Sequence, residues 1–500
     1  MTLERLSGAM YWSVIAKIAR FSTGVAANIL IVRSLGPSDW GFYSVILTIL
    51  AFVSTIIMLG AGNALLKYMP YARVKGGIRD FIATMRRLIL LQISVWFMLL
   101  LLAYFGGHLL ESFMAGRFER LGYYLTFAIG FVIFEVFLSL VTSFVQSMYE
   151  TKRYAIVTAF SNVGYIVLLI LFLKLGMGIV GILLSGAIVN IVISLLLLPQ
   201  TREMVGEYGE RGEKGPDLAT VMRFSLPFVA TGILNLIVWR HSEVIFLGMF
   251  HGEEAAGFFG LAYHVPQLLL EFVPLTIWPI VMAGISEAYT KDAARLPGSI
   301  ALYYRLLYIL VIPVAAMGFA FARPLVPIIY GDGMLPAALF AQLFFVVFSY
   351  SFIYTPLSMA LYVMEKSWIN MLIFTILAVV NVGLDLVLIP RYGLWGAFLP
   401  VALVMVLGVG AFYIVVKRME SGIYVPVAFI ARCYAAALPT AALAVTASHW
   451  NRPEQLLLQI VAGMVLLVAG FRLMRVIGPD ERGIIERLPI PFKSSILKLL

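Results

Sequence analysis

Gly36-Pro-Ser-Asp-Trp-Gly-Phe-Tyr43 has a counterpart about 215 residues later, Gly252-Glu-Glu-Ala-Ala-Gly-Phe-Phe259. Two more pairs of segments match at nearly the same offset: Glu150-Thr-Lys152 with Glu365-Lys-Ser367, and Gly178-Ile-Val-Gly181 with Gly393-Leu-Trp-Gly396. Three matches at nearly one offset predict that the chain contains two copies of a single structural unit.

The composition places these copies in a membrane. The chain has 500 residues, 62% hydrophobic and 12% charged, with a mean hydropathy of +0.98. This is the composition of a multi-pass membrane protein. About fourteen apolar stretches have the roughly 20-residue length that crosses a bilayer. They lie at 10–32, 42–63, 88–107, 121–146, 155–174, 178–199, 224–248, 257–282, 305–325, 337–362, 369–389, 394–416, 428–447 and 455–477. They do not alternate polar with apolar residues, so we predict an all-α fold and not a barrel.

The repeat predicts how the spans are grouped. Six predicted spans separate matching points, and an even number gives both halves the same orientation, as in the parallel repeats of some transporter folds. We therefore predict an N-terminal six-helix lobe at 1–207, a cytoplasmic linker at 208–220 and a C-terminal six-helix lobe at 221–417. Two added helices at 418–478 and a basic amphipathic tail at 479–500 on the inner leaflet complete the chain.

Lysine and arginine are unevenly distributed. With loops assigned alternately to the two sides, 26 of the 36 lie on one side, 7 on the other and 3 within spans. The rich side is expected to be cytoplasmic, so both termini are predicted in the cytoplasm of a chain that spans the inner membrane. This placement accounts for the net charge of +10 without nucleic-acid binding.

Three basic residues lie well inside predicted spans, away from the span ends. Lys17 and Arg20 are three residues apart, on one face of the first span, and Arg240 lies in the seventh, the repeat equivalent of the first. Charge inside a bilayer is costly and marks a functional site by default. We interpret the three as a candidate anion site, because guanidinium groups bind phosphate well. The alternative is internal pairing, of Lys17 with Glu135 or of Arg240 with Glu243.

Three titratable residues are candidates for ion coupling. Glu135 and Glu271 lie near mid-membrane, and His264 shares a span with Glu271. Each could carry a proton, and the glutamates a sodium ion, or serve only to neutralise or pack. Asp385 lies near the end of its span, where an interfacial role is expected. The eighth span holds Pro266, Pro274 and Pro279 and is the best candidate for a bent or broken helix.

Signatures of catalysis and of metal binding are missing from the sequence. It has no P-loop, HExxH or GxSxG motif and no Cys/His metal spacing. The single cysteine, Cys433, is predicted to be an inert buried thiol. The chain is therefore not expected to be an enzyme. The first apolar stretch is long and interrupted by charge, so we expect a membrane anchor and not a cleavable signal.

Two early stretches resemble the polysaccharide transporter family, the flippases of lipid-linked oligosaccharides. They are Ile31-Val-Arg-Ser-Leu-Gly-Pro-Ser-Asp-Trp-Gly-Phe-Tyr43 and Gly60-Ala-Gly-Asn-Ala-Leu-Leu-Lys-Tyr-Met-Pro70. The family pattern is R-x-L-G-P-x-x-(F/W)-G-x-Y between spans one and two, then a glycine-rich end of span two. Tyr392-Gly-Leu-Trp-Gly-Ala-Phe398 resembles the start of the family's twelfth span. The likeness in topology covers the whole chain, and the motifs cover only these patches.

The resemblance implies the fold of the multidrug/oligosaccharidyl-lipid/polysaccharide (MOP) exporter superfamily: two six-helix bundles around a V-shaped cavity, with two added helices. It implies translocation of a polyprenyl-pyrophosphate glycan, of O-antigen or exopolysaccharide type, to the outer leaflet by alternating access. Lys17, Arg20 and Arg240 would hold the pyrophosphate or acidic sugars. The implied partners are membrane lipids, the glycan lipid and a polysaccharide polymerase or ligase. No cofactor is implied beyond a coupling H⁺ or Na⁺.

Alternatives within and outside the superfamily remain. A lipid II flippase shares the same chemistry. Multidrug exporters commonly carry an aspartate in the first span, whereas this chain has Lys17 and Arg20 there. A membrane glycosyltransferase or ligase would need a large external loop, and the longest predicted one, around 108–120, is short.

The charge bias predicts the outcome of a topology experiment. Green fluorescent protein fused after Leu500 should fluoresce, because it would fold in the cytoplasm, and the same reporter fused after Gly331 should stay dark. Whole-cell fluorescence at matched expression checks this. The reverse pattern would overturn the assignment of both termini.

Overall fold

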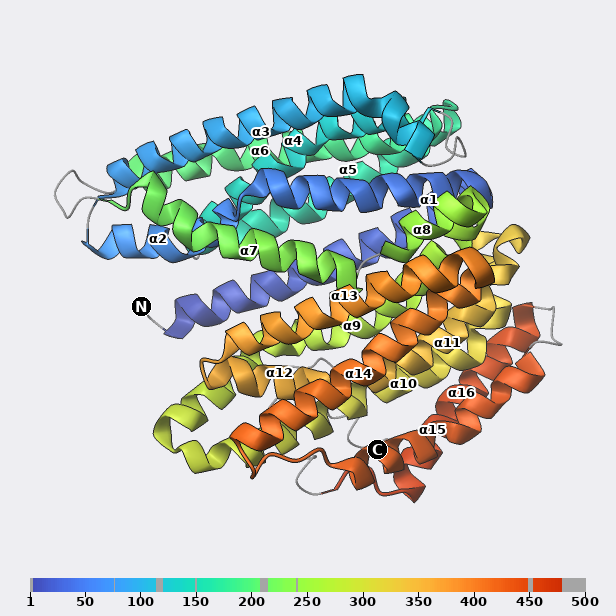
Figure 1. Ribbon diagram of the computed structural model, residues 1–500. Helices are drawn as coiled ribbons and strands as arrows, with labels where there is room; N and C mark the ends of the chain where they lie inside the picture. Colours follow the sequence, from blue (N-terminus) through green and yellow to red (C-terminus); the bar gives the residue numbers. More distant parts are fainter. Residues whose placement is uncertain are drawn as a thin grey trace. The chain divides into compact units, whose positions relative to one another are not determined.

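The computed structural model describes residues 3–75, 77–113, 120–148, 151–206, 215–239, 242–447 and 453–478. Every regular element in these ranges is helical (Figure 1), which confirms the all-α prediction. The α-helices are α1 (Leu3–Met58), α2 (Ala61–Lys75), α3 (Ile78–Phe113), α4 (Leu121–Ser147), α5 (Thr151–Lys174), α6 (Gly178–Gly206), α7 (Leu218–Trp239), α8 (Ser242–His251), α9 (Glu253–Lys291), α10 (Leu296–Tyr330), α11 (Leu335–Ser351), α12 (Tyr354–Val363), α13 (Ser367–Tyr392), α14 (Leu394–Met419), α15 (Val427–Ala447) and α16 (Pro453–Leu473). Two short 3₁₀ helices, η1 (Ala293–Arg295) and η2 (Asp332–Met334), precede α10 and α11.

Twelve segments of the described chain are long and apolar enough to cross a membrane, so the protein is a multi-pass membrane protein. The first of them, Ile18–Ala72, contains the second predicted span and most of the first. The helix α9, which contains the eighth, is not among the twelve. The count of fourteen spans stays a prediction, as do the sidedness and the identity of the membrane. The predicted tail at 479–500 lies outside the described residues.

Packing divides the chain into two compact units, Met1–Gly257 and Phe258–Leu500. The boundaries of the two predicted lobes come from the sequence repeat, whereas the two units are defined by packing. The lobe boundaries therefore stay predictions. Each unit has its own set of helix–helix contacts.

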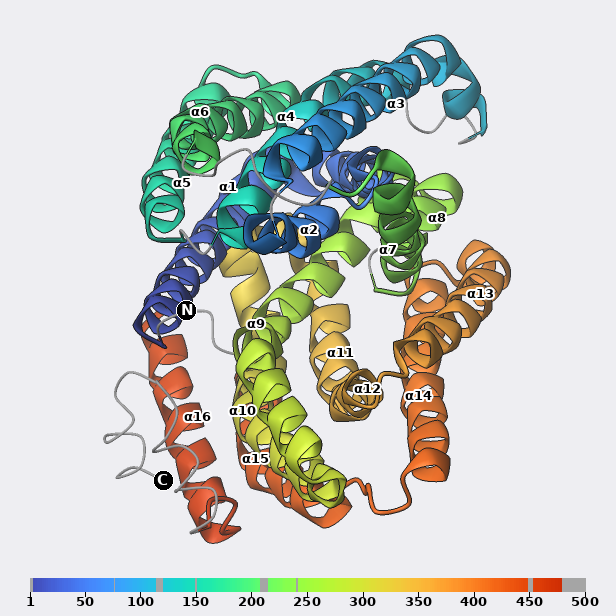
Figure 2. The same ribbon diagram turned by 90° about the vertical axis from the view of Figure 1, so that its left-hand side faces the viewer.

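In the first unit, α1 turns back on itself at Gly36, whose φ of 75° and ψ of 180° interrupt the helix. Figure 1 shows the reversal between the two parts of α1. The helix then packs against α4 and α5, α5 packs against α6, and α3 packs against α4 (Figure 2). Buried side chains from α2, α3 and α4, among them Met69, Phe81 and Leu140, form one core of this unit.

The backbones of the two repeated segments are in direct contact, with no side chain between them. A Cβ added to Gly41 would lie 1.7 Å from the carbonyl oxygen of Glu253, and one added to Gly257 would lie 2.2 Å from that of Pro37. The contact is reciprocal, because Gly41 matches Gly257 in the repeat and Pro37 matches Glu253. The hydroxyl of Ser38 also donates to Oε2 of Glu253 at 2.8 Å. Only glycine allows the backbones to approach this closely.

The start of α7 is attached to the same unit. The hydroxyl of Thr84 in α3 donates to the carbonyl of Pro216 at 2.9 Å, just before α7 begins. Gly60, with φ of 67°, lies against α7, where an added Cβ would be 2.4 Å from the carbonyl of Ser225. These contacts place α7 with the first six helices by packing, although the repeat assigns it to the second half.

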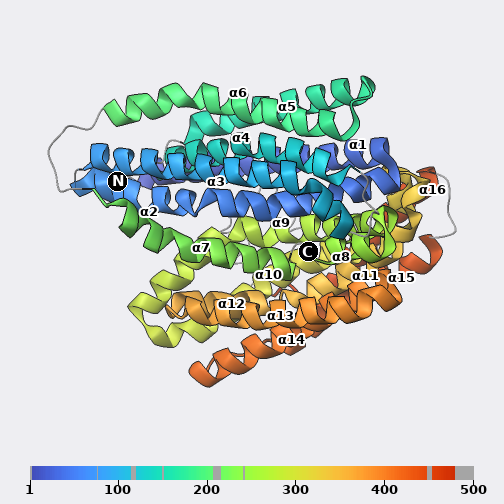
Figure 3. The ribbon, with the colours of Figure 1, turned by 45° about the horizontal axis from the view of Figure 1, so that its top comes forward.

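In the second unit, α10 packs against α11 and α15, and α15 packs against α16. The helices α13 and α14 lie side by side, as Figures 1 and 3 both show. The α15–α16 contact depends on another glycine, since a Cβ on Gly470 would lie 2.0 Å from the carbonyl of Ala436.

The tenth predicted span is broken into α11 and α12 at Phe352 and Ile353. Pro356 explains the position of the break, because proline cannot donate to the carbonyl four residues earlier and its ring clashes with it. Two tyrosines of α10 donate to carbonyls beside the break. The hydroxyl of Tyr304 donates to the carbonyl of Ile353 at 2.7 Å, and that of Tyr308 donates to the carbonyl of Ser349 at 3.1 Å.

The eighth predicted span is not broken. It runs as one helix, α9, from Glu253 to Lys291 and curves along its length (Figure 2). The bend that its three prolines predict is present, and the break lies in the tenth span instead.

Matching glycines of the repeat share a backbone conformation. Gly36 and Gly252 have φ of 75° and 89°, and Gly178 and Gly393 have φ of 52° and 55°. Left-handed conformations at matched positions support the repeat that the sequence predicts.

The reciprocal contact leads to a test of stability. Gly41→Val should lower the free energy of unfolding by at least about 1–3 kcal/mol, the usual cost of overpacking, because the backbones must separate. Thermal unfolding of purified protein measures the effect. Gly130→Ala is the control, because nothing lies within 4 Å of the added Cβ. Equal melting temperatures for the two variants would show that the contact does not hold the unit together.

Candidate functional site

The first unit brings Arg20 and Glu135 together. Arg20 in α1 is close enough to Glu135 in α4 for an electrostatic interaction, and Glu135 interacts in turn with Tyr43. Tyr165 of α5 also interacts with Tyr43, which is buried, whereas Arg20 and Glu135 are both exposed. The cluster therefore presents an accessible cation, beside an acid, in an apolar membrane-spanning segment.

The other predicted cations are less completely described. Lys17 lies in α1 one turn before Arg20, but its side chain is outside the described part of the chain. Arg240 lies outside the described residues altogether. Glu243, its suggested partner, is 2% exposed in the first turn of α8.

The remaining candidates for ion coupling, His264 and Glu271, lie on one helix of the second unit. His264, Gln267 and Glu271 of α9 are spaced by three and four residues, which puts them on one face. The amide of Gln267 donates to Oε1 of Glu271 at 3.0 Å, and Tyr354 of α12 interacts electrostatically with Glu271. Glu271 is thus held in a polar environment beside the break between α11 and α12.

Asp385 of α13 is fully buried in the second unit, and the amide of Asn381 donates to its Oδ2 at 3.1 Å. Its interfacial depth stays a prediction. A buried ionisable group in a membrane protein is a candidate for ion binding or proton transfer. The signal available from sequence was the Asn381-x-x-x-Asp385 spacing inside an apolar span, which puts both side chains on one helix face.

No cluster of three or more metal-ligating side chains occurs among the described residues. Cys433 is buried, as predicted.

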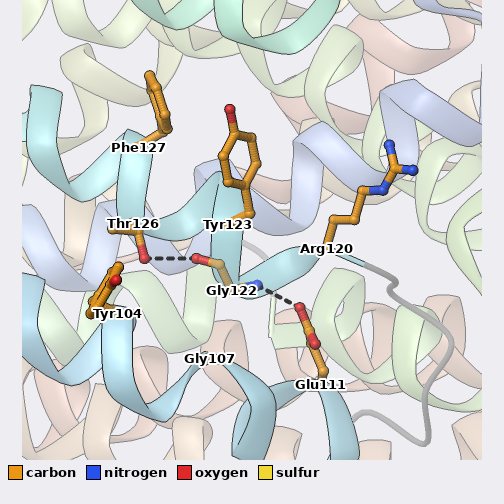
Figure 4. Close-up of a pocket in the computed structure, with 8 residues that line it drawn as sticks. All are labelled: Tyr104, Gly107, Glu111, Arg120, Gly122, Tyr123, Thr126 and Phe127. Carbon is orange, nitrogen blue, oxygen red and sulfur yellow. Dashed lines mark hydrogen bonds between the residues drawn. The ribbon is translucent and has the colours of Figure 1, made fainter.

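A cavity of about 480 Å³ lies between α3 and α4 in the first unit. Figure 4 shows Tyr123 and Phe127 side by side on α4, with Tyr104 of α3 across from them. Glu111 accepts from the backbone N–H of Gly122 at 3.0 Å, and Arg120 extends away from that carboxylate. None of these residues is among the site residues predicted from sequence.

Residues 30–339 match the family described as "Polysaccharide biosynthesis protein". The chain belongs to this family. The match confirms the family resemblance of the two early motifs, both of which lie within the matched region. No curated protein matches the chain in sequence.

Solved structures show the same fold. A "Lipid II flippase MurJ, inward closed conformation" superimposes with a TM-score of 0.75 at 16% identity, over 93% of this chain and 99% of that one. An inward-facing multidrug resistance MATE family transporter of the MOP superfamily gives a TM-score of 0.65 at 16% identity, over 80% and 94%. An outward-facing MATE structure gives 0.57 at 16% identity, over 84% and 96%. The predicted MOP-superfamily fold is therefore confirmed.

Two substitutions at Asp385 separate a structural from a functional role. Asp385→Asn keeps a hydrogen-bond acceptor for Asn381 and a similar volume, so the melting temperature should stay near that of the native chain. Asp385→Leu removes the acceptor and should destabilise by about 1–3 kcal/mol. We expect folded Asp385→Asn to lose glycan export, because it cannot titrate. Export at the native rate by Asp385→Asn would make the carboxyl group purely structural.

Proposed function

We propose that the protein is a flippase that moves a polyprenyl-pyrophosphate-linked oligosaccharide from the cytoplasmic to the outer leaflet of the inner membrane. The family match and the fold support a transporter of lipid-linked glycans. The observation that carries the proposal is Arg20, a cation kept accessible inside an apolar helix. Arg323 is also exposed on an apolar helix, but it lies near the end of its predicted span, where a charge can reach water, whereas Arg20 lies near the middle of its span.

The chemistry of the first span suits a pyrophosphate. A guanidinium forms two parallel hydrogen bonds to phosphate oxygens and stays charged at any physiological pH. Lys17, one turn away, adds a second positive charge, and Arg240 is proposed as a third. The nearby carboxylate of Glu135 limits how strongly the site holds an anion, which suits a substrate that has to be released.

Transport requires a driving force, and the proposed coupling ion is H⁺ or Na⁺. Asp385 joins Glu135, Glu271 and His264 as a candidate carrier. Asp385 and Glu271 each have a side-chain amide partner, Asn381 and Gln267, on the same helix. An amide can keep its hydrogen bond to the carboxyl group in either protonation state by rotating, so such a group can titrate without disrupting the packing.

Lipid II translocation is a second candidate, favoured by the likeness to the MurJ structure. Both candidates carry a glycan on a polyprenyl pyrophosphate and share the same proposed cation site. We place the first candidate ahead because the matching family is described by polysaccharide biosynthesis. In that setting a polysaccharide polymerase or ligase would receive the product. Neither candidate requires the protein to act as an enzyme.

Mass spectrometry of lipids that co-purify with the protein tests substrate and site together. The native chain should carry a polyprenyl-pyrophosphate glycan, and Arg20→Ala should lose at least about nine-tenths of it, as expected for one charge-assisted contact worth ~1.5–3 kcal/mol. Arg323→Ala is the matched control, an exposed arginine in the apolar helix α10. The mass of the glycan separates the two candidates.

The double variant Arg20→Ala/Glu135→Gln distinguishes substrate binding from charge neutralisation. If Arg20 binds the pyrophosphate, removal of Glu135 cannot restore the lipid. Recovery of lipid and of export in the double variant would mean that Arg20 serves only as the counter-charge of Glu135. Co-purification of organic cations in place of a glycan lipid would contradict the flippase function itself.

A further inference from the structure

We propose that the cavity between α3 and α4 binds a neutral six-membered sugar ring, with the ring face on Tyr123 and its hydroxyls between Glu111 and Arg120. The volume of about 480 Å³ falls within the roughly 300–1,000 Å³ range of small-molecule sites. The whole cavity lies in the first unit, and its lining comes from α3, α4 and the residue just before α4.

The aromatic side chains provide an apolar platform. Tyr123 and Phe127 are one turn apart on α4, with ring centroids 5.2 Å from each other, and Phe131 continues the row at 5.9 Å from Phe127. The Tyr123 side chain remains 55% exposed, so its ring face is available. The C–H face of a pyranose is weakly electropositive and stacks on the negative face of an aromatic ring.

The polar groups are suited to hydroxyls more than to an ion. Glu111 provides carboxylate acceptors, and Arg120 provides guanidinium donors that point away from Glu111 (Figure 4). A hydroxyl both donates and accepts, so a sugar can use both groups. The opposite charges cancel, which gives a phosphate or an ammonium ion little net attraction.

The backbone fixes the distance between the two sides of the cavity. Gly107 of α3 and Gly122 of α4 meet so closely that a Cβ on either would lie 2.7 Å from the Cα of the other. Glu111 is held by the Gly122 N–H. Arg120 has a left-handed backbone, with φ of 67°, which is strained for a non-glycine residue and concentrates at functional positions.

Interfacial anchoring is the simpler explanation for exposed tyrosines near the end of a span. Anchoring does not require a cavity, an acid and a base that both line it, or a strained arginine at its rim. By the predicted topology the cavity opens at the outer face, where a translocated glycan would emerge. The assignment of the bound sugar to a translocated glycan therefore rests on the function proposed above. The proposal that the cavity binds a sugar does not.

Saturation-transfer NMR on the full chain in phosphatidylcholine nanodiscs tests binding without transport. Sugar-based detergents are avoided because their headgroups would compete. Maltotriose, cellotriose and chitotriose are the probes, and at least one should show saturation transfer. Tyr123→Leu should weaken that binding about tenfold, while Tyr123→Trp keeps it, because only the aromatic face is needed. Glu111→Gln, which retains the acceptor for Gly122, should also weaken it.

Tyr392→Leu is the matched control, an exposed tyrosine at the predicted outer end of α13. It should bind the probes as the native chain does. Lack of signal from all three sugars, or equal signals from native and Tyr123→Leu protein, would overturn the proposal. So would displacement of the sugar by phosphatidylglycerol nanodiscs in a Tyr123-dependent way, which would assign the cavity to a lipid headgroup. Sugar binding by a chain that exports no glycan would contradict the flippase function and leave this proposal standing.

Discussion

The reciprocal contact of Gly41 with Glu253 and of Gly257 with Pro37 is the constraint on which the first unit depends. It brings the same turn from each copy of the repeat together, backbone against backbone, where no side chain could fit. Tyr43 follows Gly41 by two residues and belongs to the cluster that contains Glu135 and Arg20. The geometry of the candidate cation site therefore depends on two glycines, Gly41 and Gly257, which have no side chain that could bind a ligand.

Polar groups are accommodated differently in the two units. In the second, the hydroxyls of Tyr304 and Tyr308 are buried and support backbone carbonyls at the break in the tenth span. In the first, Arg20 and Glu135 remain accessible although they lie on membrane-spanning helices. Buried and satisfied groups stabilise a structure, whereas accessible charges in an apolar segment cost stability and are candidates for a functional role.

Features that have a local cause were predictable from the amino-acid sequence. Apolar length gave the helices, the spacing of glycines gave the repeat, and the Gly36-Pro37 motif marked the reversal within α1. Features that depend on packing were not predictable. The position of Asp385 along its span suggested an interfacial role but did not predict that its side chain is completely buried. The cavity between α3 and α4 was missed because its residues come from two helices and share no motif. The neighbours of Arg20 were also undetermined, since the sequence offered Glu135 only as an alternative partner of Lys17.

The break between α11 and α12 has a consequence for biosynthesis. The backbone N–H of Ile353 donates to Tyr350 and not to Ser349, so the carbonyl of Ser349 is left to accept from Tyr308 of α10, which is made earlier. An unpaired carbonyl in hydrocarbon costs several kcal/mol. The tenth span would carry that cost if it left the translocon alone. Helix α10 is thus expected to wait beside the translocon until α11 and α12 arrive, so that the three enter the lipid together. The expected unit of membrane insertion in this part of the chain is therefore a pair of spans, α10 with the broken span α11–α12, and not a single span.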